Sequence, residues 1–326
     1  MEHTATIAIT GAAGFIASYM TGYLNQQGFE NLILVDDFSV PTKMPNLEGK
    51  KYLQLIDRNN FMDWFKNNPG KIQHLFHLGA RTDTTEMDYS IHKKWNLDYS
   101  KALWEICCDQ QIPMVYASSA ATYGGGEHGY SDDHASVPLL KPLNPYGQSK
   151  QDFDVWALGQ AQSPPFWAGV KFFNVYGPNE YHKGRMASVI LHAHKQIAAG
   201  NEMKLFRSHN PDYTDGGQMR DFVYVADVVK ICIWLMDNQP TSGLYNAGSG
   251  TARTFLDLAK SIFAALSLPE KIDFVDTPED IRDKYQYFTE ANMQKLRKAG
   301  FPEPATSLEQ GVSDYVQQYL QKGHYF

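Results

Sequence analysis

The sequence predicts an α/β protein built on a Rossmann-type, doubly wound parallel sheet, with a smaller, mixed α/β C-terminal domain. In the first half of the chain, short apolar runs alternate with stretches of helical periodicity. A glycine-rich turn joins the first apolar run to the first helix, and an acidic residue ends the second run. This alternation is typical of a parallel sheet covered by helices on both faces.

Buried strands are expected where the apolar runs are short and continuous, and helices where the apolar residues recur with a helical period. The expected strands are 6–10, 32–35, 75–78, 113–117 and 169–173, and the helices between them lie near 15–27, 59–67, 92–110 and 146–161. After residue 174 two polar loops, 176–185 and 208–218, flank a helix near 186–199, and further strands are expected near 221–225 and 243–247. The tail carries three more helices, two of them opened by capping boxes at Thr254/Asp257 and Thr306/Glu309.

Composition excludes several classes of protein. The net charge of −7 argues against nucleic acid as a main partner, although local Lys and Arg can still bind an anion. Cys107, Cys108 and Cys232 form no CxxC pair and are expected to be small buried hydrophobes in a reducing compartment. No apolar run of about 18 residues and no signal peptide occurs, so a cytoplasmic protein without membrane contact is expected. No cluster has metal-ligand spacing, so no metal is predicted.

The glycine-rich turn has the spacing of a dinucleotide-binding loop. Gly11 permits a tight turn, Gly14 lets backbone N–H groups approach a pyrophosphate, and Ala17 is the third small position. Asp36 follows Gly11 by about 25 residues, close to the roughly 20 expected for an acid that binds a ribose. The order strand, glycines, helix and acid therefore predicts a nicotinamide dinucleotide cofactor.

The choice between NAD and NADP stays open. Asp36 accepts hydrogen bonds from ribose hydroxyls, which suits NAD, and Asp37 adds a second negative charge. The 2′-phosphate of NADP needs compensating cations, for which Lys43 and Arg58 are the nearest candidates.

A Tyr/Lys pair supplies the predicted chemistry. Tyr146 and Lys150 are four residues apart on an expected helix that starts at Asn144 and Pro145, which places both side chains on one face. The Lys150 ammonium is expected to lower the pKa of the neighbouring Tyr146 phenol from about 10 and so make Tyr146 a general base. Ser119 ends an apolar strand among small hydroxyl residues and is expected to bond the substrate hydroxyl or its ketone.

These elements resemble the extended short-chain dehydrogenase/reductase family, with its TGxxGxxA loop, serine and YxxxK. Residues 220–225 resemble that family's RDFVYV segment, in which the Arg, here Arg220, grips a nucleotide-sugar diphosphate. The chain is similar in more detail to the ADP-L-glycero-D-manno-heptose 6-epimerase family. That resemblance rests on the segments 116–125, 173–178, 182–189, 84–86 and 285–286, of which the HKGxMASV block at 182–189 is the most specific. Arg185 departs from the family's usual Ser, and Asp37 from its usual Asn.

The resemblance implies inversion at the exocyclic C6 carbinol of the heptose by oxidation to a ketone and return of the hydride to the opposite face. The ketone turns about the C5–C6 bond, so two acid/bases are implied, Tyr146 for one epimer and Lys183 for the other. The implied cofactor contacts are Phe15, Ile16, Asp36, Asp37, Lys43, Gly79, Ala80, Arg81, Thr82, Asn96, Lys150 and Val175. The implied substrate contacts are Asn174, Arg185, His192, Phe206, Arg207, Ser208, His209, Arg220 and Tyr285.

These features divide the chain into a dinucleotide-binding domain, 1–175 with about 221–248, and a substrate-binding domain, about 176–220 with 249–326. The resemblance further implies a role in lipopolysaccharide core synthesis, an ADP-heptose substrate and a homo-oligomer, a pentamer in the family. One alternative is another nucleotide-sugar enzyme. A 4,6-dehydratase usually carries Asp-Glu where this chain has Ala120 and Ala121, and a UDP-hexose 4-epimerase needs no second base. A second alternative, a non-catalytic dinucleotide-binding regulator, is disfavoured by the intact Ser119, Tyr146 and Lys150.

Overall fold

The computed structural model describes residues 1–200, 202–282 and 285–326 of the chain. Its main sheet has seven strands in the order β11-β6-β5-β4-β1-β2-β3, and every neighbouring pair is parallel. These strands are β1 (Ile7–Thr10), β2 (Leu32–Asp36), β3 (Gln54–Asp57), β4 (His74–His77), β5 (Met114–Ser119), β6 (Trp167–Phe172) and β11 (Gly243–Ala247). The strand order reverses at β1, which lies between β2 and β4, so the predicted Rossmann-type fold is confirmed.

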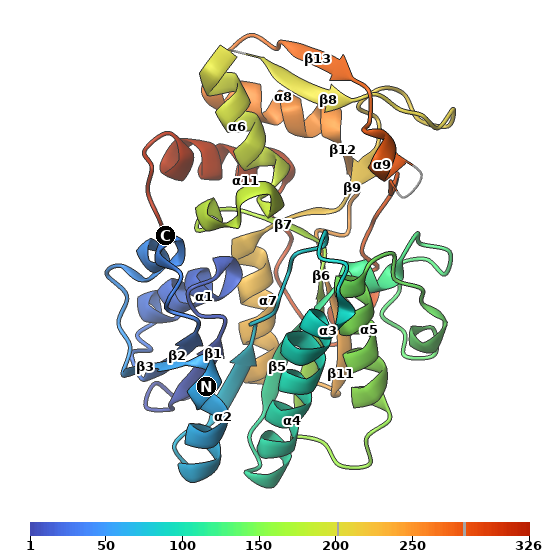
Figure 1. The fold of residues 1–326 in the computed structure, drawn as a ribbon. Helices are drawn as coiled ribbons and strands as arrows, with labels where there is room; N and C mark the ends of the chain where they lie inside the picture. The colour runs from blue at the N-terminus through green and yellow to red at the C-terminus, as the bar shows by residue number, and fades with distance from the viewer. Residues whose placement is uncertain (201, 283–284) are drawn as a thin grey trace.

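The central strands read as continuous apolar runs because both faces of the sheet are covered (Figure 1). Ile7 and Ile9 of β1 belong to the core shared with α1 (Phe15–Gln26) and α7 (Val225–Asn238). Ala8, between them, belongs to the core on the opposite face. That face is covered by α2 (Arg58–Asn67), α4 (Tyr99–Asp109) and α5 (Pro145–Leu158). Side chains alternate along a strand, so each strand serves two cores.

The second layer of structure lies beyond the carboxyl ends of the strands, at the top of Figure 1. It contains the pair β8 (Met203–Phe206) and β13 (Ile272–Val275), with helices α6 (Val189–Gly200), α8 (Phe255–Leu266) and α11 (Leu308–Asp314). Two short pairs connect the layers: β7 (Asn174–Tyr176) with β10 (Phe222–Tyr224), and β9 (Met219–Arg220) with β12 (Arg253–Thr254). The shorter helices are α3 (Tyr89–His92), α9 (Glu279–Arg282) and α10 (Gln294–Lys298). The two-domain division stays a prediction.

Several local expectations were wrong. Strands β3, β8 and β13 were not expected. In β3 one residue of four is buried, so an edge strand leaves no apolar run in the sequence. The capping box at Thr254 and Asp257 is confirmed, whereas α11 is capped by Ser307, and Thr306 instead donates to Asp227. The described part of the tail contains α8, α9, α10 and α11 rather than three helices.

No helix within the described ranges combines the length and the apolar character needed to cross a bilayer.

Candidate active site

The glycine loop lines a cavity of about 580 Å³. Gly11 has a φ of +70°, and a Cβ at this position would lie 2.6 Å from the Cα of Gly79, so only glycine fits. Gly14, Phe15 and Ile16 line the same cavity where α1 begins. The backbone at the start of α1 therefore borders an open space, in the position where helix N-termini bind phosphate.

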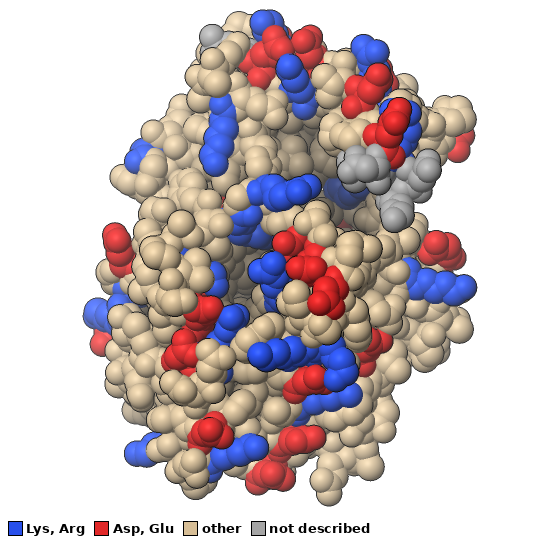
Figure 2. All heavy atoms as spheres, in the orientation of Figure 1, with Lys and Arg blue, Asp and Glu red and all other residues tan. Residues whose placement is uncertain are grey.

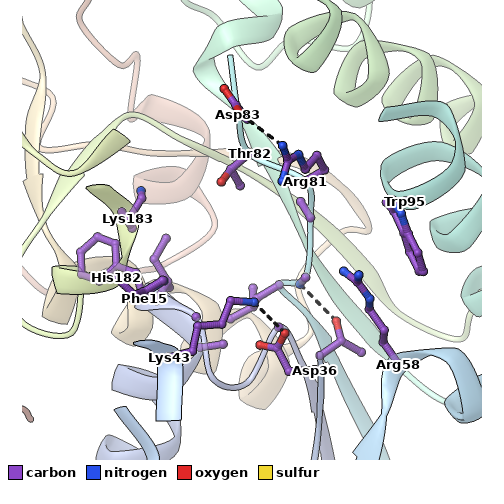
Figure 3. Close-up of a pocket in the computed structure, with 18 of the residues that line it drawn as sticks. Phe15, Asp36, Lys43, Arg58, Arg81, Thr82, Asp83, Trp95, His182 and Lys183 are labelled. Carbon is purple, nitrogen blue, oxygen red and sulfur yellow. Dashed lines mark hydrogen bonds and ion pairs between the residues drawn. The ribbon is translucent and has the colours of Figure 1, made fainter. Parts of the chain in front are cut away.

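Asp36 ends β2 and Asp37 follows it, and each carboxylate is paired with a cation beside this cavity. Figure 3 shows Asp36 with Lys43, and Arg58 nearby. Lys43 Nζ lies 3.0 Å from Asp36 Oδ1, and an Arg58 guanidinium nitrogen lies 2.9 Å from Asp37 Oδ2. The Arg58 guanidinium also stacks 4.0 Å from the centroid of the Trp95 ring. Asp36 is thus held at the edge of the cavity, where a carboxylate can accept hydrogen bonds from a ribose.

The cavity lining is positively charged although the chain as a whole is negative. Lys and Arg side chains gather around a hollow on the face shown in Figure 2. The basic residues that line the cavity are Lys43, Arg58, Arg81, Lys183 and Arg185. A diphosphate fits this field, and the glycine cradle and Asp36 fit the rest of a nicotinamide dinucleotide.

The structure brings most of the predicted cofactor residues to this cavity: Gly11, Gly14, Phe15, Ile16, Asp36, Lys43, Arg58, Gly79, Ala80, Arg81 and Thr82. The predicted residues outside the lining are Asp37, Asn96, Lys150 and Val175. Asn96 lies one layer behind, since its side chain accepts from Arg81 N at 2.7 Å and donates to Arg81 O at 3.0 Å.

Sequence reasoning missed other lining residues, among them His77, Asp83, Trp95, Tyr99, His182 and Met186. Trp95 and Tyr99 are four residues apart, next to Asn96, so their helical spacing was a signal that could have found them. Asp83 lies in an irregular segment and gave no such signal, whereas His182 and Met186 lie in the 182–189 block that carried the family resemblance.

The predicted Tyr/Lys pair lies on α5. Asn144 caps this helix by accepting from Gly147 N at 2.8 Å, and Pro145 occupies its first turn, as expected. A Cβ on Gly147 would lie 2.8 Å from Ala121 O, so glycine lets the first turn approach the segment that follows β5. This approach places half-buried Tyr146 near Ser119, the last residue of β5.

Lys150 is almost fully buried one turn further along α5. Its ammonium donates to Ala117 O at 2.8 Å. Burial lowers the pKa of Lys150 to about 8, and the Asp154 carboxylate acts in the opposite direction. Burial raises the pKa of Tyr146, while the Ser119 side chain lowers it. The expected lowering of the Tyr146 pKa was therefore wrong for this structure, since burial outweighs the favourable contacts.

Lys183 lines the cofactor cavity from a different element, the 3-10 segment Tyr181–Met186. Its ammonium lies 5.4 Å from the centroid of the Phe15 ring, at the start of α1 (Figure 3). Burial lowers the pKa of Lys183, and the buried Glu180 carboxylate raises it. Lys183 is half-buried, and a partly desolvated lysine of this kind can exchange a proton nearer to neutral pH than a surface lysine.

Some of the predicted substrate residues form a second cluster. The Arg220 guanidinium is buried and lies 5.4 Å from the centroid of the Tyr285 ring. Phe206 packs edge-on against Tyr285, with 6.2 Å between ring centroids. Arg207, Ser208 and His209 follow β8 directly, and His209 N donates to Tyr287 Oη at 3.2 Å. Tyr287 belongs to this cluster and was not predicted.

Arg185 is the one predicted substrate residue in the lining of the described cavity. Asn174 begins β7 and is exposed, and His192 is half-buried on α6. No contact among the described residues joins these two side chains to Arg220 or Tyr285, and their roles stay predictions. Within the described ranges, no group of three or more His, Cys, Asp or Glu side chains is suited to a metal ion.

Comparison with known families settles the class of protein. The NAD dependent epimerase/dehydratase family matches residues 7–248. This chain belongs to that family. The match spans the glycine loop, the Tyr146/Lys150 helix and the segment that carries Lys183, so the family's cofactor is the group that the cavity fits.

Individual relatives are similar over nearly their whole length. An ADP-L-glycero-D-manno-heptose-6-epimerase of Nitratidesulfovibrio vulgaris (strain DP4) is 48% identical over 314 residues, which cover 96% of this chain and 97% of the relative. One of Fusobacterium nucleatum is 44% identical and covers 97% of this chain and 98% of the relative. The crystal structure of the Helicobacter pylori ADP-L-glycero-D-manno-heptose-6-epimerase superposes with a TM-score of 0.81 at 28% identity, covering 98% of this chain and 99% of that one.

Proposed function

We propose that this chain interconverts the two C6 epimers of ADP-glycero-manno-heptose, through a 6-keto intermediate, with a bound nicotinamide cofactor. The observation that carries the proposal is the position of Lys183. This half-buried lysine lines the same cavity as the phosphate loop, on an element separate from the Tyr146/Lys150 helix. Relatives at 44% and 48% identity carry the name of this epimerase, which supports the same substrate.

The proposed mechanism assigns one acid/base to each epimer. A nicotinamide held by the glycine loop and Asp36 would supply the acceptor and donor for the C6 hydride. Tyr146 takes the hydroxyl proton of one epimer, with Ser119 bonding the same oxygen and the Lys150 ammonium favouring the phenolate. Once the ketone has turned about the C5–C6 bond, Lys183 donates a proton to the oxygen in its new position. Hydride return leaves the cofactor unchanged, so the cycle is redox-neutral. Proton exchange with solvent then returns Tyr146 to the phenolate and Lys183 to the ammonium before the next turnover.

We propose roles for the remaining predicted residues on the same basis. Arg220 and Tyr285 hold the diphosphate and base of the nucleotide sugar, as the charge and the stacked ring suit such a ligand. Arg185 stands where the heptose epimerase family usually has Ser, and it makes a further contact with a phosphate or hydroxyl group in the cavity. The two domains have the bounds given above, and the protein is a cytoplasmic homo-oligomer that serves lipopolysaccharide core synthesis.

The test is incubation of the purified protein with ADP-D-glycero-D-manno-heptose, followed by proton NMR. The L-glycero epimer is expected to appear without net reduction of the cofactor. A parallel sample with UDP-glucose tests the 4-epimerase alternative. Conversion of UDP-glucose to UDP-galactose, with the heptose unchanged, would contradict the proposal.

A further inference from the structure

A fully buried ion pair lies behind the Tyr146/Lys150 pair and outside the cavity lining. Lys171 of β6 and Asp154 of α5 are 2.7 Å apart, and both side chains have 0% exposure. Every other ion pair among the described residues has at least one partly exposed partner. A buried pair gains little stability over apolar residues of the same size, because both charges lose their water. Stability alone is therefore a weak reason for this pair.

Each charged atom of the pair has further hydrogen-bond partners. Asp154 Oδ2 accepts from Ser118 Oγ at 2.6 Å as well as from Lys171, and Asp154 Oδ1 accepts from Tyr116 Oη at 3.0 Å. Lys171 Nζ also donates to Thr122 Oγ1 at 2.7 Å. The pair is thus the centre of a fully buried polar network, and its several shared hydrogen bonds restrict its geometry.

The network joins the two elements that carry the reacting groups. Tyr146, Lys150 and Asp154 follow one another at intervals of four residues, so they share one face of α5. Lys150 bonds the carbonyl of Ala117 on β5, and Asp154 bonds the side chain of Ser118, the next residue. These two hydrogen bonds, one helical turn apart, fix the position of α5 relative to β5.

The same network reaches the serine. Thr122 accepts from Lys171 and donates from its hydroxyl to Ser119 O at 2.8 Å. Lys171 also lies opposite Ser118 in the ladder between β5 and β6. Any shift of the ion pair is therefore transmitted to Ser119 as well as to α5.

We propose that Asp154 and Lys171 are positioning residues, which hold Tyr146, Lys150 and Ser119 in register and keep the local charge beside Lys150 balanced. This inference rests on the proposed function, because it concerns the residues that the mechanism uses. It assigns no contact with substrate to either residue.

The charge balance has a definite sign at Lys150. Burial lowers the pKa of Lys150 to about 8, and Asp154 raises it, so Asp154 favours the ammonium form. The titratable and charged groups around Lys150 and the ion pair are Tyr146, Tyr116, Tyr123, His77, His92, His134, Asp132 and Lys171. Burial lowers the pKa of His77 to about 3, so that ring stays neutral over the working range. Removing the Asp154 charge and removing the Lys171 charge must therefore act on Lys150 in opposite directions.

The experiment compares Asp154→Asn, Lys171→Met, the double variant and a control. For each, kcat and KM for the heptose substrate are measured from pH 6 to pH 10, with thermal unfolding and cofactor affinity measured separately. The control is Lys230→Met, on α7, which breaks a partly exposed ion pair in which Lys230 Nζ lies 2.7 Å from the Glu303 carboxylate. We expect the alkaline limb of kcat to move to lower pH by about one unit in Asp154→Asn and to higher pH in Lys171→Met.

The double variant tests positioning without an uncompensated buried charge. It is expected to fold, because both charges are removed together. Its kcat is expected to fall about tenfold to a hundredfold, with KM and cofactor affinity within about threefold of the wild type, since small displacements of reacting groups cost this much. The control is expected to match the wild type.

The outcomes separate this inference from the proposed function. An active wild-type protein whose double variant keeps the wild-type kcat would overturn the positioning role alone. The charge-balance role is overturned if both single variants move the alkaline limb in one direction. A wild-type protein that interconverts no heptose epimers would overturn the proposed function and this inference with it.

Discussion

The two lysines that the proposed mechanism uses, Lys150 and Lys183, lie on structurally different elements. Lys150 belongs to α5, a regular helix of 14 residues that begins with a capped turn and is held by a buried polar network. Lys183 belongs to a six-residue 3-10 segment, in which Gly184 has a φ of +53° and a non-helical conformation. Both ammonium groups are nevertheless buried enough to have lowered pKa values.

The loop lysine is stabilised by one buried acid rather than by a helix. The Glu180 carboxylate has 0% exposure and accepts from Ser188 N at 2.6 Å and from Ser188 Oγ at 2.5 Å. The backbone carbonyl of Glu180 accepts a hydrogen bond from Lys183 N at 3.0 Å. A lysine pKa can therefore be lowered both on a regular helix and on a short segment held by one buried acid. The activity should respond differently to mutations around these two lysines.

The largest effect is expected for Tyr146→Phe. This change removes the phenol that exchanges the substrate proton while keeping the ring, and general acid/base groups of this kind contribute roughly 10² to 10⁴ in rate. We expect kcat for epimerisation to fall about a thousandfold, measured by proton NMR. Tyr52→Phe, at a 38% exposed tyrosine, is the control and should be fully active. A Tyr146→Phe variant with more than a tenth of the wild-type kcat would show that another group is the base.

Lys183→Met is expected to lower the epimerisation kcat about a hundredfold, because one epimer then lacks its acid/base. The oxidation half-reaction, measured for each epimer, should distinguish the role of Lys183 from that of Tyr146. Oxidation of the epimer that uses Tyr146 should persist, seen as reduced nicotinamide in a single turnover. Lys195→Met, an exposed position on α6, is the matched control. Equal loss of both partial reactions would mean that Lys183 holds the substrate and transfers no proton.

The difference in support also explains what could be predicted from the sequence. The α5 site follows from local rules, since Asn144, Pro145 and the four-residue spacing fix both the helix and the face that its side chains share. The burial of Tyr146 depends on elements far along the chain, and for that reason the direction of its pKa shift was predicted wrongly.

The loop site had no comparable local rule. Lys183 was predicted from a family resemblance, and no periodicity indicated that its segment would lie against α1. The strands β3, β8 and β13 were missed for the same reason, because in each of them at most two of the four residues are buried. Patterns in sequence record burial along one element, whereas the cavity is made where several elements meet.

Glu180→Gln should have a moderate effect that depends on pH. The Glu180 charge raises the pKa of Lys183, so its removal lowers that pKa further and the ammonium form is lost at a lower pH. We expect the alkaline decrease in kcat to occur at lower pH than in the wild type. At pH values above this decrease, the kcat of the variant should be about tenfold below the wild-type value. Glu105→Gln, at an exposed position of α4, is the control. A limb that moves to higher pH, or does not move, would contradict the role of Glu180.

The smallest effect on the epimerisation rate is expected at Asp37 and Arg58, the residues that we propose influence the choice between NAD and NADP. Arg58 is paired with Asp37 at 2.9 Å, and a hydrogen bond from Ser39 lowers the pKa of Asp37, which keeps that carboxylate charged. The guanidinium is therefore partly neutralised and repulsion from Asp37 opposes a 2′-phosphate. Asp37→Asn should free Arg58 and raise the affinity for NADP relative to NAD about tenfold, which corresponds to about 1.4 kcal/mol.

Titration of the apo protein with each dinucleotide measures this ratio, and Asp109→Asn on α4 controls for a general loss of negative charge. Arg58→Gln should act in the opposite direction and weaken NADP binding more than NAD binding, because its planar fork suits a phosphate. The epimerisation rate at saturating cofactor should stay near the wild-type value in both variants, since neither side chain belongs to α5 or to the Lys183 segment. A large loss of kcat in Asp37→Asn would mean that the acid at the end of β2 affects the reacting groups and not only the ribose end of the cofactor.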